Sequence, residues 1–227
     1  MTWKVAIFGT GPHGRAIREN LRAERPRLVV WLDDKVRRGT QIGTEVVIGG
    51  RELLFGEFSR EHEIIVAIGD NKIRGEIART IKQYGGKLGT SIHPTAIISK
   101  TDTVIGDGTV IMPFAIIGPG VRIGEYCIIN NRATVAHDSI VENGVNVSDG
   151  VTFTTHVGEE AWLGLHACVI PGTKIGARAI VGAGSVVTRE VEADTTVGGV
   201  PARVIKNYGT HGPKNLLDPI HLQNIIR

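Results

Sequence analysis

A histidine and an aspartate stand side by side at His137 and Asp138, inside the mostly aliphatic stretch ATVAHDSIV (residues 133–141). An imidazole whose pKa lies near neutrality can accept a proton from an attacking nucleophile, and a nearby carboxylate favours the imidazolium that results. Adjacent strand residues face opposite sides, so direct contact between the two requires a corner in the chain or a neighbouring subunit. The pair is a candidate for general-base catalysis; the alternative is that both are ordinary solvated residues.

A second candidate site is the segment GTGPHG (residues 9–14), which fits the pattern G-x-G-x-x-G between an expected strand and an expected helix. Backbone N–H groups at such a helix start can hold a phosphate, and Asp33 at the end of the next strand could bind a ribose hydroxyl. This pattern alone suggests a nicotinamide dehydrogenase. The α/β half is too short for a whole dinucleotide, and His13 places an imidazole in the loop, so we favour a mononucleotide pyrophosphate. Alternatively, the glycines serve only a tight turn.

These two candidate sites belong to two differently patterned halves. Residues 1–90 alternate between strand-like and helix-like segments, which predicts a small Rossmann-like βαβ domain with a parallel sheet. The expected strands are residues 4–8, 28–32 and 63–68, and the expected helices are residues 15–25 and 71–84.

From residue 105 onward, aliphatic residues recur every six positions, first from Ile105 to Val147 and then, out of phase, from Val157 to Val187. This period predicts a parallel β-helix over residues 91–207, in which three hexads close one coil and residues 18 apart stack. Because ten residues rather than twelve separate Val147 from Val157, one coil is two residues short. Counting 18 residues from His137 places Thr155 beside it. The tail, residues 208–227, carries no pattern that indicates chemistry.

Composition narrows the function further. With 227 residues, 22% of them charged and 41% hydrophobic, the chain is typical of a globular protein without membrane spans. Two cysteines and an N-terminus unlike a signal peptide favour the cytoplasm. The net charge of +3 suits anionic small molecules, and the few aromatic residues argue against nucleic acid.

Three histidines of the repeat region raise the possibility of a zinc-dependent carbonic anhydrase. His137, His156 and His166 lie 19 and 10 residues apart, which does not match the ligand spacing of that family. We therefore expect no metal, and His156 is a second, weaker candidate for a catalytic base.

Seven segments together carry a resemblance to a known family: GTGPHG (9–14), WLDD (31–34), AIGDNKIR (67–74), SIHPTAIIS (91–99), VIMPFAIIGPG (110–120), ATVAHD (133–138) and GGVPAR (198–203). On these segments the chain resembles the hexapeptide-repeat sugar acetyltransferases, in the branch with sialic-acid O-acetyltransferase-like proteins and N-acetyltransferases of nucleotide-linked 4-amino-4,6-dideoxy sugars. The departures from that family are Pro12 and Asn146, where relatives carry a glycine and a second histidine.

The resemblance implies a left-handed β-helix and an acetyl-CoA-dependent N-acetyltransferase in which His137 is the general base and Asp138 supports it. A triangular prism with three flat faces also predicts a homotrimer with binding clefts between subunits. The acceptor is expected to be a nucleotide-linked amino sugar, with UDP more probable than GDP or dTDP. The alternatives are O-acetylation of a sialic-acid-like sugar and a non-catalytic nucleotide-sugar-binding protein. We expect the acceptor at Gly11, His13, Gly14, Asp33, Asp34, Gly69 and Asn130, and CoA at Thr155, Gly164, Arg203 and Lys206.

Overall fold

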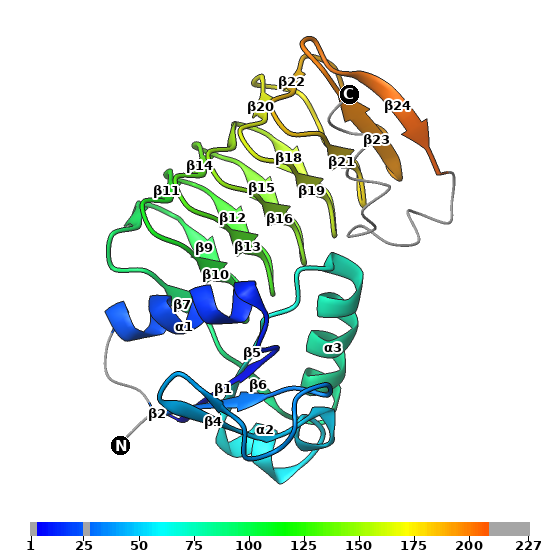
Figure 1. The fold of residues 1–227 in the computed structure, drawn as a ribbon. Coiled ribbons are helices and arrows are strands. Elements are labelled where there is room, and N and C mark those ends of the chain that lie inside the picture. The colour runs from blue at the N-terminus through cyan, green and yellow to red at the C-terminus, as the bar shows by residue number, and fades with distance from the viewer. Residues whose placement is uncertain (1–3, 25–27, 209–227) are drawn as a thin grey trace.

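The computed structural model describes residues 4–24 and 28–208, which form a small α/β unit and a long β-helix standing on it (Figure 1). Apart from Tyr208, the predicted tail lies outside the described residues. No helix in the described ranges is long and apolar enough to cross a membrane.

The α/β unit contains a six-stranded sheet in the order β3-β4-β2-β1-β5-β6. Its strands are parallel except for β3, which pairs with β4 in an antiparallel hairpin. Helix α1 lies between this sheet and the first coils of the β-helix (Figure 1), where Asn20 donates a buried hydrogen bond to Ser91 Oγ at 2.8 Å. The elements are β1 (Lys4–Phe8), α1 (Pro12–Glu24), β2 (Leu28–Leu32), β3 (Gln41–Ile42), β4 (Glu45–Gly49), the 3-10 helix η1 (Arg51–Leu53), α2 (Glu57–Glu61), β5 (Glu63–Val66), α3 (Asn71–Gln83) and β6 (Lys87–Leu88).

The Rossmann-like character predicted from the sequence is confirmed, although some boundaries differ. Helix α1 begins at Pro12, inside the glycine motif, and not at residue 15. Proline suits the first position of a helix because its fixed φ is helical and its missing N–H is not needed there. The strand expected over residues 63–68 ends at Val66. The short elements β3, α2 and β6 were not predicted, nor was β4, which is as long as β1 and β2.

The β-helix is built mostly from two-residue strands that alternate among three sheets, and each of the first four coils contributes one strand to each sheet. In the next two coils, Ile175 and Val191 form isolated bridges in place of a strand of the third sheet. The first sheet contains β7 (Ser91–Ile92), β10 (Val110–Ile111), β13 (Ile128–Ile129), β16 (Asn146–Val147), β19 (Trp162–Leu163), β21 (Ile180–Val181), β23 (Thr195–Gly198) and the antiparallel β24 (Arg203–Asn207). The second contains β8 (Ile97–Ile98), β11 (Ile116–Ile117), β14 (Thr134–Val135), β17 (Thr152–Phe153), β20 (Cys168–Val169) and β22 (Val186–Val187). The third contains β9 (Val104–Ile105), β12 (Arg122–Ile123), β15 (Ile140–Val141) and β18 (His156–Val157).

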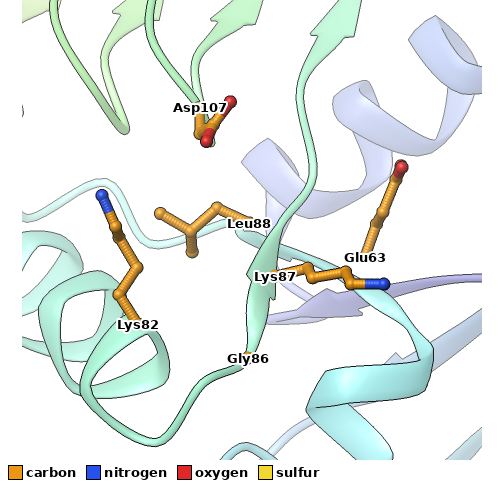
Figure 2. Close-up of a pocket in the computed structure, with 6 residues that line it drawn as sticks. All are labelled: Glu63, Lys82, Gly86, Lys87, Leu88 and Asp107. Carbon is orange, nitrogen blue, oxygen red and sulfur yellow. The ribbon is translucent and has the colours of Figure 1, made fainter.

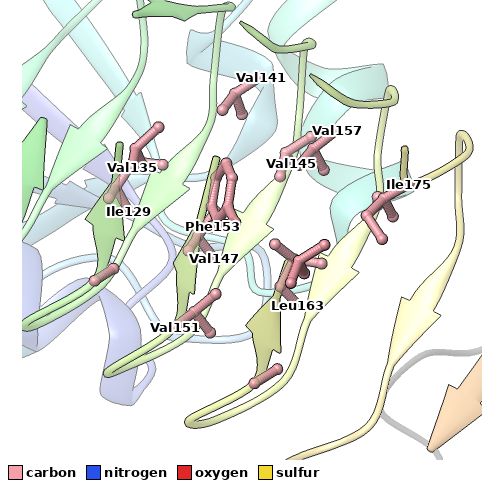
Figure 3. Close-up of a cluster of buried hydrophobic side chains, with 14 of the residues drawn as sticks. Ile129, Val135, Val141, Val145, Val147, Val151, Phe153, Val157, Leu163 and Ile175 are labelled. Carbon is pink, nitrogen blue, oxygen red and sulfur yellow. The ribbon is translucent and has the colours of Figure 1, made fainter. Parts of the chain in front are cut away.

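The second residue of most of these strands points into the prism and stacks on its equivalent in the next coil. Figure 3 shows this column of buried side chains, in which Phe153 is the bulkiest and only 1% exposed. Stacking of this kind gives each coil an apolar floor and ceiling, so the coils stabilise one another. The hexapeptide β-helix predicted from the sequence is thus confirmed.

The two missing residues are absent from one corner of the prism, which we call the short corner (Thr154–Thr155). Val135 pairs with Phe153, 18 residues on, whereas Val141 pairs with Val157, only 16 residues on. Thr155 therefore lies opposite Ser139, to whose Oγ its N–H donates at 3.2 Å, and not opposite His137 as the count of 18 predicted. The corner that carries His137 and Asp138 consequently has a shorter corner as its neighbour.

The two units are joined by Arg74, a fully buried side chain on α3. Its guanidinium donates to the carbonyl oxygens of Tyr126 (2.9 Å) and Gly144 (2.6 Å) in the β-helix. It also donates to Ile68 O (2.9 Å) and to Asn71 Oδ1 (2.7 Å) in its own unit. Burial lowers the pKa of Arg74 to about 10, so the group stays charged at neutral pH while it satisfies carbonyls on both sides.

Replacement of Arg74 by alanine is expected to lower the free energy of unfolding by at least about 3 kcal/mol, because several buried carbonyls lose their donor. Arg79 is a matched control: it lies on the same helix but is half-exposed beside Glu159 and Glu160, so Arg79→Ala should cost less than about 1 kcal/mol. Urea unfolding followed by circular dichroism measures both. Equal losses in the two variants would contradict the role given to Arg74.

Candidate functional site

The corner between β14 and β15 brings His137 and Asp138 into direct contact. Asp138 has φ of 56°, a left-handed conformation that turns the chain and places its Oδ2 at 3.0 Å from Nδ1 of His137. Gly120 of the preceding coil makes room for this carboxylate, since a Cβ there would lie 2.4 Å from Asp138 Oδ1. Both side chains are largely solvent-exposed, at 66% and 82%. The sequence analysis required a corner for this contact, and the chain provides one.

The hydrogen bond between the two residues fixes what His137 can do. A carboxylate only accepts hydrogen bonds, so in neutral His137 the nitrogen facing Asp138 carries the hydrogen and Nε2 keeps its lone pair. Nε2 has no hydrogen-bond partner within the described part of the chain. His137 can therefore accept a proton at Nε2, and the carboxylate stabilises the imidazolium that forms.

Next to this pair lies a pocket of about 240 Å³. Both residues of the short corner, Thr154 and Thr155, form part of its wall. Among the residues named from the sequence, His137, Asp138 and Thr155 come together here. The lining consists of His137, Asp138, Ile140, Thr154, Thr155, His156, Gly172 and Lys174.

The second histidine of this pocket, His156, also has a carboxylate partner. Its Nε2 lies 2.8 Å from Glu142 Oε1, and the other oxygen of Glu142 accepts the backbone N–H of Glu159 at 2.8 Å. The β-sheet register explains this approach, because His156 pairs with Ile140 and Glu142 follows two residues later. The sequence named His156 as a candidate but gave no sign of its partner, which is 14 residues away.

The two acids expected to bind the nucleotide are engaged with protein groups. Asp33 accepts hydrogen bonds from Thr10 N (2.9 Å), Thr10 Oγ1 (2.7 Å) and Lys35 N (2.8 Å). Partial burial acts to raise the pKa of Asp33, but these hydrogen bonds outweigh it and lower the pKa below its ordinary value. Asp34 accepts from Arg51 N at 2.8 Å and from Arg51 Nε at 2.7 Å. Asp33 thus ties the glycine loop to the end of β2, and Asp34 fixes the start of η1.

His13, in the glycine loop, is half-buried and has an unsatisfied polar atom. Its Nε2 is buried without a hydrogen-bond partner among the described residues. Burial, and then the charge of Arg74, lower the pKa of His13 to about 4, so the imidazole is neutral at physiological pH. A buried and unpaired ring nitrogen can hydrogen-bond a ligand that enters the loop.

Glycine is required at both ends of this loop and optional in its middle, since Gly9 has a φ of 112°. A Cβ at Gly14 would lie 2.0 Å from Gly9 O, whereas a Cβ at Gly11 would meet nothing within 4 Å. Gly14 therefore lets α1 start directly against β1. Gly69 lies on the neighbouring loop, where its carbonyl accepts from Arg74 at 3.3 Å.

The other residues expected at the site do not line the pocket of His137. Asn130 donates to Val147 O at 3.1 Å, which ties one coil to the next. Gly164 is buried, and a Cβ there would lie 2.7 Å from Val181 O, so it permits close stacking of two coils. Arg203 and Lys206 are exposed on β24, at the far end of the prism from the α/β unit (Figure 1).

A second pocket, of about 290 Å³, lies between the sheet edge at β6 and the β-helix (Figure 2). Its lining mixes both signs of charge and contains none of the residues named from the sequence. It is lined by Glu63, Lys82, Gly86, Lys87, Leu88 and Asp107. Across the described residues, no group of three or more His, Cys, Asp or Glu side chains could hold a metal ion. Of the two pockets, only that of His137 brings together residues named from the sequence.

Comparison with protein families matches both units of the chain. Residues 4–81 match the PglD N-terminal domain, and residues 102–137 match the bacterial transferase hexapeptide repeat.

Individual relatives match along nearly the whole chain. GDP-perosamine N-acetyltransferase of Escherichia coli O157:H7 is 31% identical over 218 residues, which cover 90% of this chain and 97% of that protein. The acetyltransferase domain of PglB from Neisseria gonorrhoeae, solved with acetyl coenzyme A, is 33% identical with a TM-score of 0.85 and covers 90% of this chain and 100% of that one. A histidine-to-alanine mutant of GDP-perosamine N-acetyltransferase from Caulobacter crescentus, solved with CoA and GDP-perosamine, is 33% identical with a TM-score of 0.83 and covers 90% of this chain and 97% of that one. The chain therefore belongs to the hexapeptide-repeat family of sugar N-acetyltransferases that carry a PglD-type N-terminal domain.

Proposed function

We propose that this protein transfers the acetyl group of acetyl-CoA to the amino group of a nucleotide-linked 4-amino-4,6-dideoxy sugar. The observation that carries the proposal is the 3.0 Å contact between His137 and Asp138 beside the pocket at the short corner. Relatives solved with acetyl coenzyme A, and with CoA and GDP-perosamine, support both substrates.

His137 is the general base of the proposed reaction. The amine attacks the thioester carbonyl carbon, and its nitrogen becomes acidic as the carbon–nitrogen bond forms. Nε2 of His137 accepts the released proton, while Asp138 holds the ring orientation and stabilises the imidazolium. The same proton can then pass to the sulfur of the departing CoA thiolate.

The proposed binding sites divide between the two units. The glycine loop holds the nucleotide diphosphate through Gly11 and Gly14, and the unpaired Nε2 of His13 supports a ligand there. Asp33 and Asp34 hold the loops around this nucleotide site through their hydrogen bonds to Thr10 and Arg51. Gly69 and Asn130 border the bound amino sugar. Thr155 lines the acetyl pocket and Gly164 allows the coils to stack. The exposed cations Arg203 and Lys206 suit the phosphates of CoA.

We further propose that the active form is a homotrimer. Exposed aliphatic side chains follow the second sheet at Ile97 and Ile116 and the third sheet at Val104 and Ile140. Apolar stripes of this kind on a flat face are typical of a surface that a second copy covers. The glycine loop does not line the pocket of His137 in the same chain. In the proposed trimer, the glycine loop of one copy lies beside the His137 pocket of its neighbour. Light scattering at micromolar concentration should give the mass of three chains; the mass of one chain would contradict this assembly.

His137→Ala should lower the rate of CoA release by about a hundredfold or more, the usual loss for a general base, while KM changes little. Free thiol released from acetyl-CoA in the presence of the amino-sugar nucleotide measures the rate. His93→Ala is a matched control, because His93 is a half-buried histidine in the first coil whose side chain bonds only locally to Thr95. Near-full activity of His137→Ala would place the base elsewhere.

Among the nucleoside diphosphates, UDP is expected to raise the melting temperature more than GDP or dTDP, because a ligand that binds the folded state stabilises it according to its affinity. A UDP-N-acetylbacillosamine N-acetyltransferase from Bacillus subtilis is 39% identical over 118 residues, about half of each chain, whereas two relatives covered to 97% of their length are named for GDP-perosamine. Asp34→Asn should reduce the shift with the preferred diphosphate and leave that with CoA unchanged. Asp107→Asn, a carboxylate of the other pocket, is the control. Stabilisation by GDP alone would overturn the UDP assignment and indicate a GDP-linked amino sugar.

A further inference from the structure

Two histidine–carboxylate pairs flank one pocket. His137 with Asp138 lies at the corner before β15, and His156 with Glu142 lies on the third sheet one coil later. Both imidazoles line the pocket that the short corner leaves open. A single general base accounts for only one of these pairs.

The hydrogen bond of His156 leaves one ring nitrogen available. Because Glu142 only accepts, Nε2 of neutral His156 carries the hydrogen and Nδ1 keeps its lone pair. Within residues 4–24 and 28–208, Nδ1 has no hydrogen-bond partner. Glu142 is itself held by the N–H of Glu159, so the ring has a fixed orientation. His156 thus presents a proton acceptor in the same way as His137 does at Nε2.

The charges around His156 come from three parts of the β-helix. Glu142 follows β15 and contacts the ring directly, and Glu159, just after β18, contributes its N–H to Glu142. Lys174, from the following coil, and Asp138, from the corner before, line the same pocket. Asp138 and Lys174 thus line the pocket with opposite charges, and Glu142 on the ring of His156 adds a second carboxylate, so the charge near this ring suits a positively charged amine.

An amine acceptor has two protons to lose. At neutral pH a sugar amine is largely an ammonium ion, which has no lone pair and cannot attack a carbonyl carbon. It must lose one proton before the attack and a second as the carbon–nitrogen bond forms. A hydroxyl acceptor would lose only one.

We propose that His156 is a second catalytic base, which takes the first of these protons; this inference rests on the proposed function. Nδ1 of His156 removes a proton from the ammonium ion and leaves the neutral amine. The amine nitrogen forms a bond to the thioester carbon, the carbonyl electron pair moves to oxygen, and Nε2 of His137 takes the second proton. The carbonyl then re-forms, the carbon–sulfur bond breaks with its electron pair on sulfur, and His137 returns its proton to give the free thiol of CoA. His156 releases the other proton to water, so one amide, one thiol and one proton result.

The pH dependence of two variants tests this assignment. His156→Asn should lower kcat/KM by about a hundredfold slightly below neutral pH, where the acceptor is an ammonium ion. The rate should approach that of the wild type at a pH above the pKa of the acceptor, because solution then supplies the neutral amine. His137→Ala should stay slow over the whole pH range, since the proton that His137 accepts leaves the amine only during the attack itself. Glu142→Gln keeps the ring of His156 but removes its carboxylate partner. This variant should show the same pH-dependent loss as His156→Asn in a milder form, and it replaces His156→Asn in the test if that variant fails to fold.

His166→Asn is the matched control, an exposed corner histidine at φ of 55°, a conformation that asparagine tolerates, and it should match the wild type at every pH. A loss in His156→Asn that is the same at all pH values, or no loss at all, would overturn the assignment while leaving the acetyltransferase intact. Absence of thiol release by the wild type with any amino-sugar nucleotide would instead overturn the proposed function.

Discussion

Hydrogen bonding between successive coils is the constraint on which the rest of this structure depends. Each coil pairs with the next in parallel register, and this pairing holds only if corresponding strands repeat after a fixed number of residues. A deletion can therefore be absorbed only at a corner, where the backbone is not paired strand to strand. The chain omits two residues at Thr154–Thr155, and the strands on either side keep their pairing. The shortened corner lines the pocket beside His137, and the strand pairing of the core continues past it.

The same rigid frame supplies the chemistry. Left-handed corner residues such as Asp138 turn a side chain back toward its neighbour, which produces a histidine–carboxylate contact between adjacent residues. Parallel pairing produces the other contact, between His156 and Glu142 on consecutive coils. Arg74 fixes the α/β unit to this frame through buried carbonyl groups, so the glycine loop is held by the scaffold that also carries the bases. Sites held by such elements keep their geometry without a ligand.

The sequence could predict the β-helix because every inward position must be apolar, and this produces the period of six. It placed the deletion between Val147 and Val157 but not at its corner, because Phe153 fills the inward position that an aliphatic residue fills in the other coils. With Phe153 included, the period of six continues to residue 153 and breaks only before Val157. His137 and Asp138 could be named as candidates from residue type, but their contact depends on the corner at Asp138. The roles of Asp33 and Asp34 could not be predicted, because the partners of their carboxylates, Thr10 and Arg51, depend on the tertiary structure.

The most direct test of the account is a mass balance on the purified protein with acetyl-CoA and a nucleotide-linked 4-amino-4,6-dideoxy sugar, with the matching 4-hydroxy sugar nucleotide as the control acceptor. Mass spectrometry of the sugar and titration of free thiol measure the two products. The proposed reaction releases one thiol for each acetamide formed at the amino group and no thiol with the hydroxy analogue. Acetylation of a hydroxyl group, or no thiol release with UDP-, GDP- and dTDP-linked amino sugars alike, would contradict it.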